Sequence, residues 1–136
     1  MTDRTERVQE LLGQTSYVLL TTFRRDGRPV GTPVWSAPLG DGRIALVTQD
    51  TTGKVKRVRR DPHVLVAPCT QRGKPLGRPV DAQAEVLAAQ ELPEVERRLA
   101  AKYGVLFQLF DAVEGFLQRR GRMRGSRVAV AVTVAG

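Results

Sequence analysis

Short apolar segments separated by turn sequences recur along this 136-residue chain and leave it few folds to adopt. Each segment is rich in β-branched residues or alternates apolar with polar positions, as half-buried strands do. Asp26-Gly27 and Gly40-Asp41-Gly42 indicate tight turns, because glycine tolerates the positive φ angles that such turns require. We expect six strands, over residues 16–24, 28–36, 43–48, 63–69, 80–88 and 126–134.

The first three expected strands follow one another through short turns, which predicts an antiparallel meander over residues 16–48. The second of them contains Pro29 and Pro33. Proline has no N–H to give to a strand ladder, so this strand should lie at a sheet edge or form a bulge.

Helices are predicted between the strands. Residues 3–13 carry a narrow apolar stripe at helical spacing. Residues 53–60 form a short basic helix that Thr51 or Thr52 can cap and that Asp61-Pro62 must end.

A longer helical stretch covers residues 91–120, and Gly104 is expected to divide it into two helices. Its second half presents a broad apolar face, formed by Leu106, Phe107, Leu109, Phe110, Val113, Phe116 and Leu117. Strands with helices inserted between them indicate an α+β fold, and the length suits one domain over residues 1–136 built on a small antiparallel barrel.

The net charge of +8 comes from two short segments. Residues 53–60 and 119–127 hold five cations each, and the rest of the chain has 12 Lys and Arg against 14 Asp and Glu. Two local clusters favour a specific anionic group over a general polyanion surface. Nucleic acid is the less favoured partner, because aromatic residues make up only 5% of the chain and none stud a basic strand.

Several classes of protein are disfavoured by composition. No run approaches the roughly 20 apolar residues of a membrane span, and the charged amino terminus does not resemble a secretory signal. Cys69 is the only cysteine, so neither a disulfide framework nor a metal cluster is expected. We expect a soluble, cytoplasmic protein with no metal and no membrane partner.

Candidate catalytic residues are few. His63 has no evident nucleophile or carboxylate partner, which favours a structural role, and Cys69 lies in an apolar strand where a thiol is inert. The acidic residues are scattered over turns and a helix start, so no pair suggests acid–base chemistry. No catalytic side chain is predicted, and the sequence contains no evident set of residues for hydrolytic catalysis.

The segment over residues 48–62 is more informative. A Thr-Thr-Gly turn that opens a basic helix offers free backbone N–H groups, and the amides of Gly53 and Lys54 could hold a phosphate with Lys54 as its counter-charge. The alternative is a solvated amphipathic helix whose Val55 and Val58 contact the sheet. Trp35, the only tryptophan, is either a core anchor or a wall for a flat ring.

Three segments together resemble a known family: DGRPVGTPVW at residues 26–35, TTGKVKRVRRDP at residues 51–62, and KYG followed by FQLFDAVEGFLQRR near the carboxyl end. The chain resembles the split-barrel family of pyridoxamine 5'-phosphate oxidases and deazaflavin-dependent (F420-dependent) reductases, and its ending is similar to the B-type reductases. The resemblance implies a split β-barrel homodimer that holds its cofactor in a groove between the subunits.

The resemblance also implies which residues bind the cofactor. Lys54 corresponds to the phosphate-contacting lysine, Thr48 closes the preceding strand, and Thr52 is the hydroxyl residue of the turn. Lys54, Arg57 and Arg60, with the arginines of residues 119–127, would follow an anionic tail. The full set implied is Thr32, Pro33, Val34, Trp35, Thr48, Thr52, Gly53, Lys54, Arg57 and Arg60.

One departure from the family bears on the cofactor. FMN-binding members carry an arginine and a lysine where this chain has Thr32 and Ala37, and each missing charge-assisted hydrogen bond is worth roughly 1.5–3 kcal/mol. This favours coenzyme F420 over FMN. The resemblance then implies hydride transfer between F420 and a small unsaturated or aromatic substrate. The alternatives are an FMN-dependent oxidase or reductase of the same fold, or a non-catalytic F420 carrier.

Overall fold

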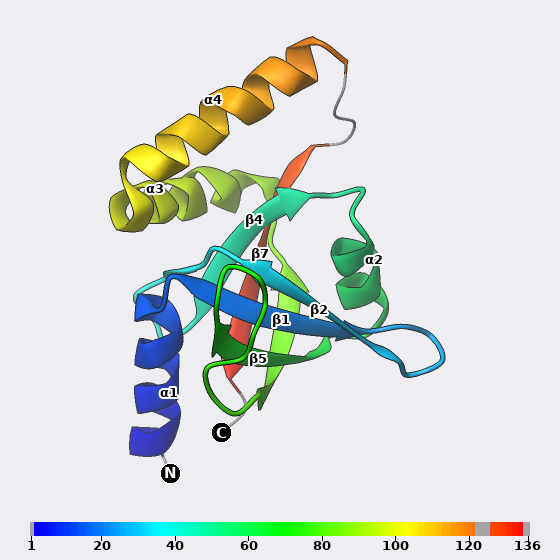
Figure 1. Cartoon of the computed structure of the whole chain (residues 1–136), viewed down its shortest axis with the longest axis vertical. Helices are drawn as coiled ribbons and strands as arrows, with labels where there is room; N and C mark the ends of the chain where they lie inside the picture. Colours follow the sequence, from blue (N-terminus) through cyan, green and yellow to red (C-terminus); the bar gives the residue numbers. More distant parts are fainter. Residues whose placement is uncertain (1, 122–125, 135–136) are drawn as a thin grey trace.

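The computed structural model describes residues 2–121 and 126–134. Seven strands form a single antiparallel sheet that curls into a half-barrel, and four α-helices lie around it, which makes the fold α+β as expected (Figure 1). In chain order the elements are α1 (Thr2–Gln14), β1 (Tyr17–Phe23), β2 (Pro29–Val34), β3 (Ala37–Pro38), β4 (Ile44–Gln49), α2 (Gly53–Arg60), β5 (His63–Cys69), β6 (Val80–Val86), the 3₁₀ turn η1 (Ala89–Glu91), α3 (Leu92–Tyr103), α4 (Val105–Arg119) and β7 (Arg127–Val134).

The strand order in the sheet is β2-β1-β5-β6-β7-β4-β3, and it corrects one prediction. The hairpin of β1 and β2 forms as expected, but the predicted meander does not, because β4 pairs with β3 and β7 instead of β2. Pro29 and Pro33 account for this: they leave β2 short of N–H donors, which suits an edge strand with one neighbour. β4 is apolar and pairs with β7 instead, in a part of the sheet where both faces are covered.

The residues of β4 alternate between two separate cores. Ile44 and Leu46 belong to the cluster inside the half-barrel, which α1 and α2 help to close. Ala45 and Val47 face the other way and join the cluster under α3 and α4. Successive side chains of a strand point to opposite faces, so this one strand contributes to both layers. The second layer is the one that supports the candidate site.

The short basic helix forms as predicted. α2 begins at Gly53 and ends at Arg60, with Asp61 in the C-cap position. Val55 and Val58 are buried, while its cations are exposed or half-exposed. Thr52 occupies the N-cap position, but its hydroxyl donates to the carbonyl of Gln49 (2.9 Å) instead of capping the helix. The free amides of the first turn of α2 are therefore not satisfied by that side chain.

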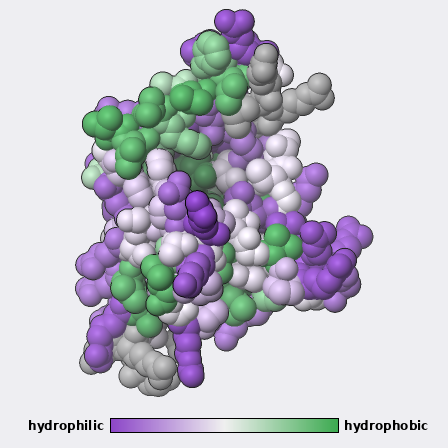
Figure 2. Space-filling model, viewed as in Figure 1, coloured by the Kyte–Doolittle hydropathy of each residue, from purple (hydrophilic) through white to green (hydrophobic). Residues whose placement is uncertain are grey.

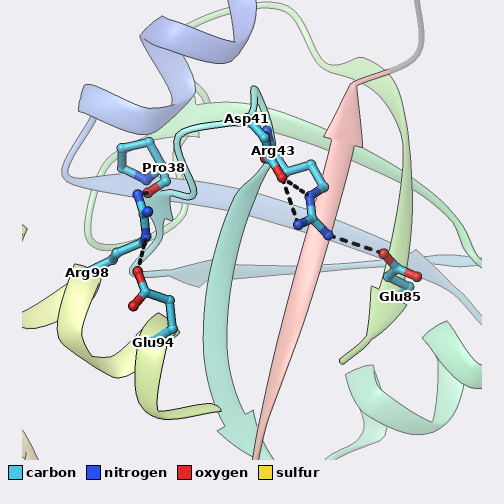
Figure 3. A network of polar contacts seen from close by, with 6 residues as sticks. All are labelled: Pro38, Asp41, Arg43, Glu85, Glu94 and Arg98. Atoms are coloured by element: carbon cyan, nitrogen blue, oxygen red, sulfur yellow. Dashed lines mark hydrogen bonds and ion pairs between the residues drawn. The ribbon is translucent and has the colours of Figure 1, made fainter. Parts of the chain in front are cut away.

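Charged side chains fasten α3 and the turn after β3 to the sheet (Figure 3). Arg43 pairs with Asp41 at 2.8 Å and with Glu85 of β6 at 3.4 Å. Arg98 of α3 donates to the carbonyl of Pro38 at 3.2 Å. These contacts are partly exposed, so each contributes little stability by itself. The Arg43 pairs hold the turn after β3 against β6, and the Arg98 hydrogen bond holds α3 against β3.

The last turn of α3 is anchored more deeply. The ammonium of Lys102 donates to the carbonyls of Thr15 and Ser36, at 2.7 and 2.6 Å. The hydroxyl of Tyr103 donates to the carbonyl of Ser16 at 2.7 Å. Burial lowers the pKa of Lys102 to about 8, because the charged ammonium loses hydration.

Gly104 separates α3 from α4 as predicted, with a φ angle of 60°. The apolar face of α4 is present, but within the described chain only Phe107 is buried in it. Figure 2 shows this apolar surface along α4. Its exposed members, with 45–77% of their surface accessible, are Val105, Leu106, Leu109, Phe110, Val113 and Phe116. Across the described ranges, no helix combines the length and apolar character needed to cross a membrane.

The lowered pKa of Lys102 predicts a pH dependence of stability. Between about pH 8 and pH 10.5 the unfolded chain keeps this proton more than the folded chain does, so the free energy of unfolding rises with pH over this range. We expect Lys102→Met to remove that rise in urea titrations, and Lys56→Met, at an exposed position of α2, to retain it. A rise of equal size in both variants would contradict the assignment.

Candidate functional site

A partly open cavity of about 420 Å³ lies among β2, the end of β4, the first turn of α2 and the facing sides of α3 and α4. This volume falls within the range of roughly 300–1,000 Å³ that small-molecule sites occupy. The residues that line it come from segments distant in sequence, which the curl of the sheet and the α3–α4 pair bring together. The cavity is the candidate functional site.

Six of the ten residues predicted for cofactor binding line this cavity: Thr32, Pro33, Val34, Trp35, Thr48 and Lys54. The first four belong to the edge strand β2 and the residue after it, Thr48 closes β4, and Lys54 is in the first turn of α2. The fold therefore brings the two motifs 26–35 and 51–62 to one place although β2 and β4 are not neighbours in the sheet.

Aromatic rings form one side of the cavity. Trp35 stacks on Tyr103 with 4.7 Å between ring centroids and an interplanar angle of 13°. Phe110 of α4 lies tilted against Trp35 at 5.7 Å, and Phe107 also lines the cavity. Trp35 packs on the core under α3 and also lines the cavity, so its position is compatible with both roles considered for it. Flat, rigid rings are suited to contact a planar ligand.

Lys54 is the cation of the cavity. Its ammonium forms no hydrogen bond or ion pair with the described residues, although it is half-buried. Burial, together with the charge of Arg57, lowers the pKa of Lys54. An anionic ligand group would compensate this ammonium for its lost hydration. It could also accept hydrogen bonds from the free N–H groups at the start of α2.

The other four predicted residues do not line the cavity. Arg57 donates through Nε to the hydroxyl of Thr22 at 2.6 Å, and Arg60 donates to the carbonyl of Phe23, so both reach toward β1. Thr52 lies behind Thr48, with 3.5 Å between their hydroxyl oxygens. At Gly53 a Cβ would come within 2.6 Å of the Arg57 guanidinium, so this position adjoins Arg57.

The second basic segment, residues 119–127, gives a mixed result. Arg122 and Arg124 lie outside the described residues. Arg120 lies over the ring of Phe116 at 5.1 Å. Arg127, one of the arginines that could follow an anionic tail, is surrounded by carboxylates in the structure.

Arg127 at the start of β7 joins three acidic side chains. It pairs with Glu114 of α4, with Glu96 of α3 at 2.5 Å and with Asp111 of α4 at 2.6 Å. Burial disfavours the charge of Arg127, but the hydrogen bonds that it donates to these carboxylates outweigh that effect and raise its pKa. Glu114 also lines the cavity, so the cluster fixes one cavity wall.

Sequence reasoning missed this cluster. Asp111 and Glu114 are three residues apart on an otherwise apolar helix, and such a spacing puts both carboxylates on one helix face. This spacing of two carboxylates was the available signal, but it did not identify Arg127 as their partner. The cavity residues that were not among the ten predicted for cofactor binding are Tyr17, Val47, Gln49, Gln71, Leu99, Phe107, Phe110 and Glu114.

His63 and Cys69 lie away from the cavity. His63 stacks on Phe23 and its ring nitrogen lies 2.7 Å from Asp81, so the expectation that it lacks a carboxylate partner is wrong. Cys69 is buried as expected, and burial raises the pKa of its thiol. Over residues 2–121 and 126–134, no group of three His, Cys, Asp or Glu side chains is placed to hold a metal ion.

The sequence over residues 4–136 matches the family model of pyridoxamine 5'-phosphate oxidase, and the chain belongs to this family of split barrels. Curated proteins yield no significant match.

Solved structures with the same fold differ in what they bind. An F420 reductase superposes with a TM-score of 0.58 at 18% identity, covering 94% of this chain and 93% of the other. An FAD-binding protein from Mesorhizobium loti gives 0.61 at 18% identity, with coverages of 96% and 88%. The haem storage protein HutZ from Vibrio cholerae gives 0.65 at 10% identity, with coverages of 96% and 89%. At these identities the likeness shows the fold, and the ligand must be argued from the site.

Proposed function

We propose that this protein is an F420-dependent oxidoreductase that transfers a hydride between the deazaflavin coenzyme and a small unsaturated or aromatic substrate. It acts as a homodimer of one domain per chain, over residues 1–136. The observation that carries the proposal is the cavity itself, with an aromatic wall around Trp35 and the unpaired ammonium of Lys54.

The residues at the cavity fit the parts of F420. Lys54 and the start of α2 hold its phosphodiester, and the backbone of 32–35 with Trp35 lines its planar ring. When bound, F420 would supply a ring carbon that accepts or donates hydride, and the proton that accompanies the hydride would pass to or from solvent water. The protein contributes placement of the substrate and exclusion of water, which Phe107 and Phe110 support.

The positions that departed from the FMN-binding pattern favour F420 over FMN. Thr32 lines the cavity without a charge, and Ala37 is fully buried against the core under α3. A lysine at position 37 would have no access to a ligand phosphate from this buried place. Lys54 is therefore the one cation left of the three that hold the FMN phosphate in the pattern.

The dimer is supported by the uncovered apolar face of α4. Monomeric proteins rarely expose apolar patches of more than a few hundred Å², and α4 places six large apolar side chains at its exposed surface. The same helix lines the cavity through Phe107, Phe110 and Glu114. A second subunit packed on α4 would close the open side of the cavity.

Other functions are compatible with this fold. An FMN- or FAD-dependent enzyme remains the nearest alternative, and a non-catalytic F420 carrier has the same binding site. Haem has less support, because haem iron is held by His, Cys, Met or Tyr, and among the described residues only Tyr17 is of these types and lines the cavity.

The cofactor is tested by comparing affinities. We expect F420 to bind at least about tenfold more tightly than FMN, a difference of about 1.4 kcal/mol, because two of the three phosphate cations are replaced. Fluorescence titration of the purified protein with both cofactors measures this. Stoichiometric FMN in protein purified from a host that lacks F420 would contradict the proposal.

Lys54 is tested by substitution. We expect Lys54→Ala to weaken F420 binding by about 1.5–3 kcal/mol with little change in melting temperature, since a charge-assisted hydrogen bond is lost. Lys54→Arg should recover only part of the affinity, because a forked guanidinium does not replace a compact ammonium. Lys56→Ala, two residues along the same helix and exposed, is the matched control and should bind normally.

The dimer is tested on α4. We expect Leu109→Glu to shift the protein from dimer to monomer in light scattering at micromolar concentration, because the carboxylate would be buried without a partner. Leu76→Glu places the same charge on an equally exposed leucine in the loop before β6 and should leave the dimer intact. A wild-type monomer under these conditions would overturn the dimer.

A further inference from the structure

Gln49, the last residue of β4, carries an amide that the protein leaves unsatisfied. Its side chain is buried, with 8% of the residue accessible, and neither Oε1 nor Nε2 has a hydrogen-bond partner within the described chain. Its backbone carbonyl is satisfied, since it accepts from the hydroxyl of Thr52. Buried polar groups are nearly always paired, because an unpaired one destabilises the folded state.

The neighbouring strand explains why the amide has no partner. Gln49 lies directly opposite Arg127 in the β4–β7 ladder, so the two side chains project from the same face of the sheet. The guanidinium of Arg127 is committed to carboxylates, through Nε to Glu114 and through NH1 to Glu96. Gln49 therefore stands next to a strong donor that is already occupied.

The surroundings do not require a polar residue for packing. On the same face of the sheet, Val47 joins the apolar core under α3, and Leu99 and Phe107 belong to that core. A leucine or methionine would fill this place without an unpaired amide. Gln49 lines the same cavity as Lys54 and Glu114, so a bound molecule is the available partner for its amide.

We infer that Gln49 is a ligand-recognition residue whose amide pairs with a neighbouring donor and acceptor on the bound ring. A carboxamide presents one acceptor oxygen and an N–H donor side by side, which complements a cyclic imide edge such as the N3–H and adjacent carbonyl of a deazaflavin or flavin. A phosphate or carboxylate has only acceptors and would leave Oε1 unpaired.

This inference rests on the proposed function only in taking the cavity as the cofactor site. The dione edge is common to deazaflavins and flavins, so the role of Gln49 does not depend on which of the two binds. In this proposal, Lys54 binds the anionic part of the cofactor, and Gln49 forms hydrogen bonds with the edge of its ring.

The test uses tail-free probes, so that contacts to Lys54 do not mask the effect. Affinities of the full-length protein for 5-deazariboflavin and riboflavin are compared with those for their N3-methyl derivatives, which lack the N3–H donor. We expect the wild-type protein to bind each parent compound at least about tenfold more tightly than its N3-methyl derivative. Equal affinities in the wild-type protein would overturn the inference without any variant.

Gln49→Met then removes the amide and keeps the side-chain volume. We expect this variant to lose at least about tenfold in affinity for the parent compounds, to lose the preference over the N3-methyl forms, and to melt at the same or a higher temperature. Gln83→Met, at an exposed position of β6 outside the cavity, is the matched control and should keep the preference. A Gln49→Met protein that melts lower and keeps the preference would assign Gln49 a purely structural role.

The two proposals fail separately. If riboflavin binds better than 5-deazariboflavin and both lose affinity on N3-methylation, the deazaflavin proposal is wrong and the role of Gln49 stands. If deazaflavin is preferred but N3-methylation has no effect, the proposed cofactor stands and the role of Gln49 is wrong.

Discussion

The ion cluster of Arg127 is the interaction on which the arrangement of the site depends. A mostly buried guanidinium at the start of β7 binds Glu96 of α3 and both Asp111 and Glu114 of α4, so one side chain ties two helices to the sheet. Removing one partner from such a group leaves a buried charge without compensation, which is costly. The cluster therefore holds α4 in the place where it forms a wall of the cavity.

The second constraint is the position of β2 at the edge of the sheet. Its prolines limit it to one hydrogen-bonded neighbour, which leaves the residues from Thr32 to Trp35 free to line an opening instead of a ladder. β4 lies at the other end of the strand order and brings Thr48 and Gln49 to the same opening, because the sheet curls. A flat sheet with this order would keep the two motifs apart.

The polar groups of the cavity divide the work of recognition. Lys54 has no partner in the described chain and is proposed to hold an anion, whereas Gln49 has both a donor and an acceptor unmet. The rings around Trp35 provide a flat apolar surface between such polar groups. Membership in the pyridoxamine 5'-phosphate oxidase family makes a planar redox cofactor the natural occupant, and the residues at the cavity decide which one is proposed.

The sequence by itself determined the local elements and part of the site. Strand alternation, the turn glycines and the Gly104 break predicted nearly every helix and strand, because these signals act over a few residues. Motif resemblance located Lys54 and the 32–35 segment. Only the tertiary structure decided that β4 pairs with β7, that Arg127 binds carboxylates instead of a ligand tail, and that Gln49 is buried without a partner. Those outcomes depend on which distant strands and helices meet, and contacts between distant segments leave no periodic pattern in the chain.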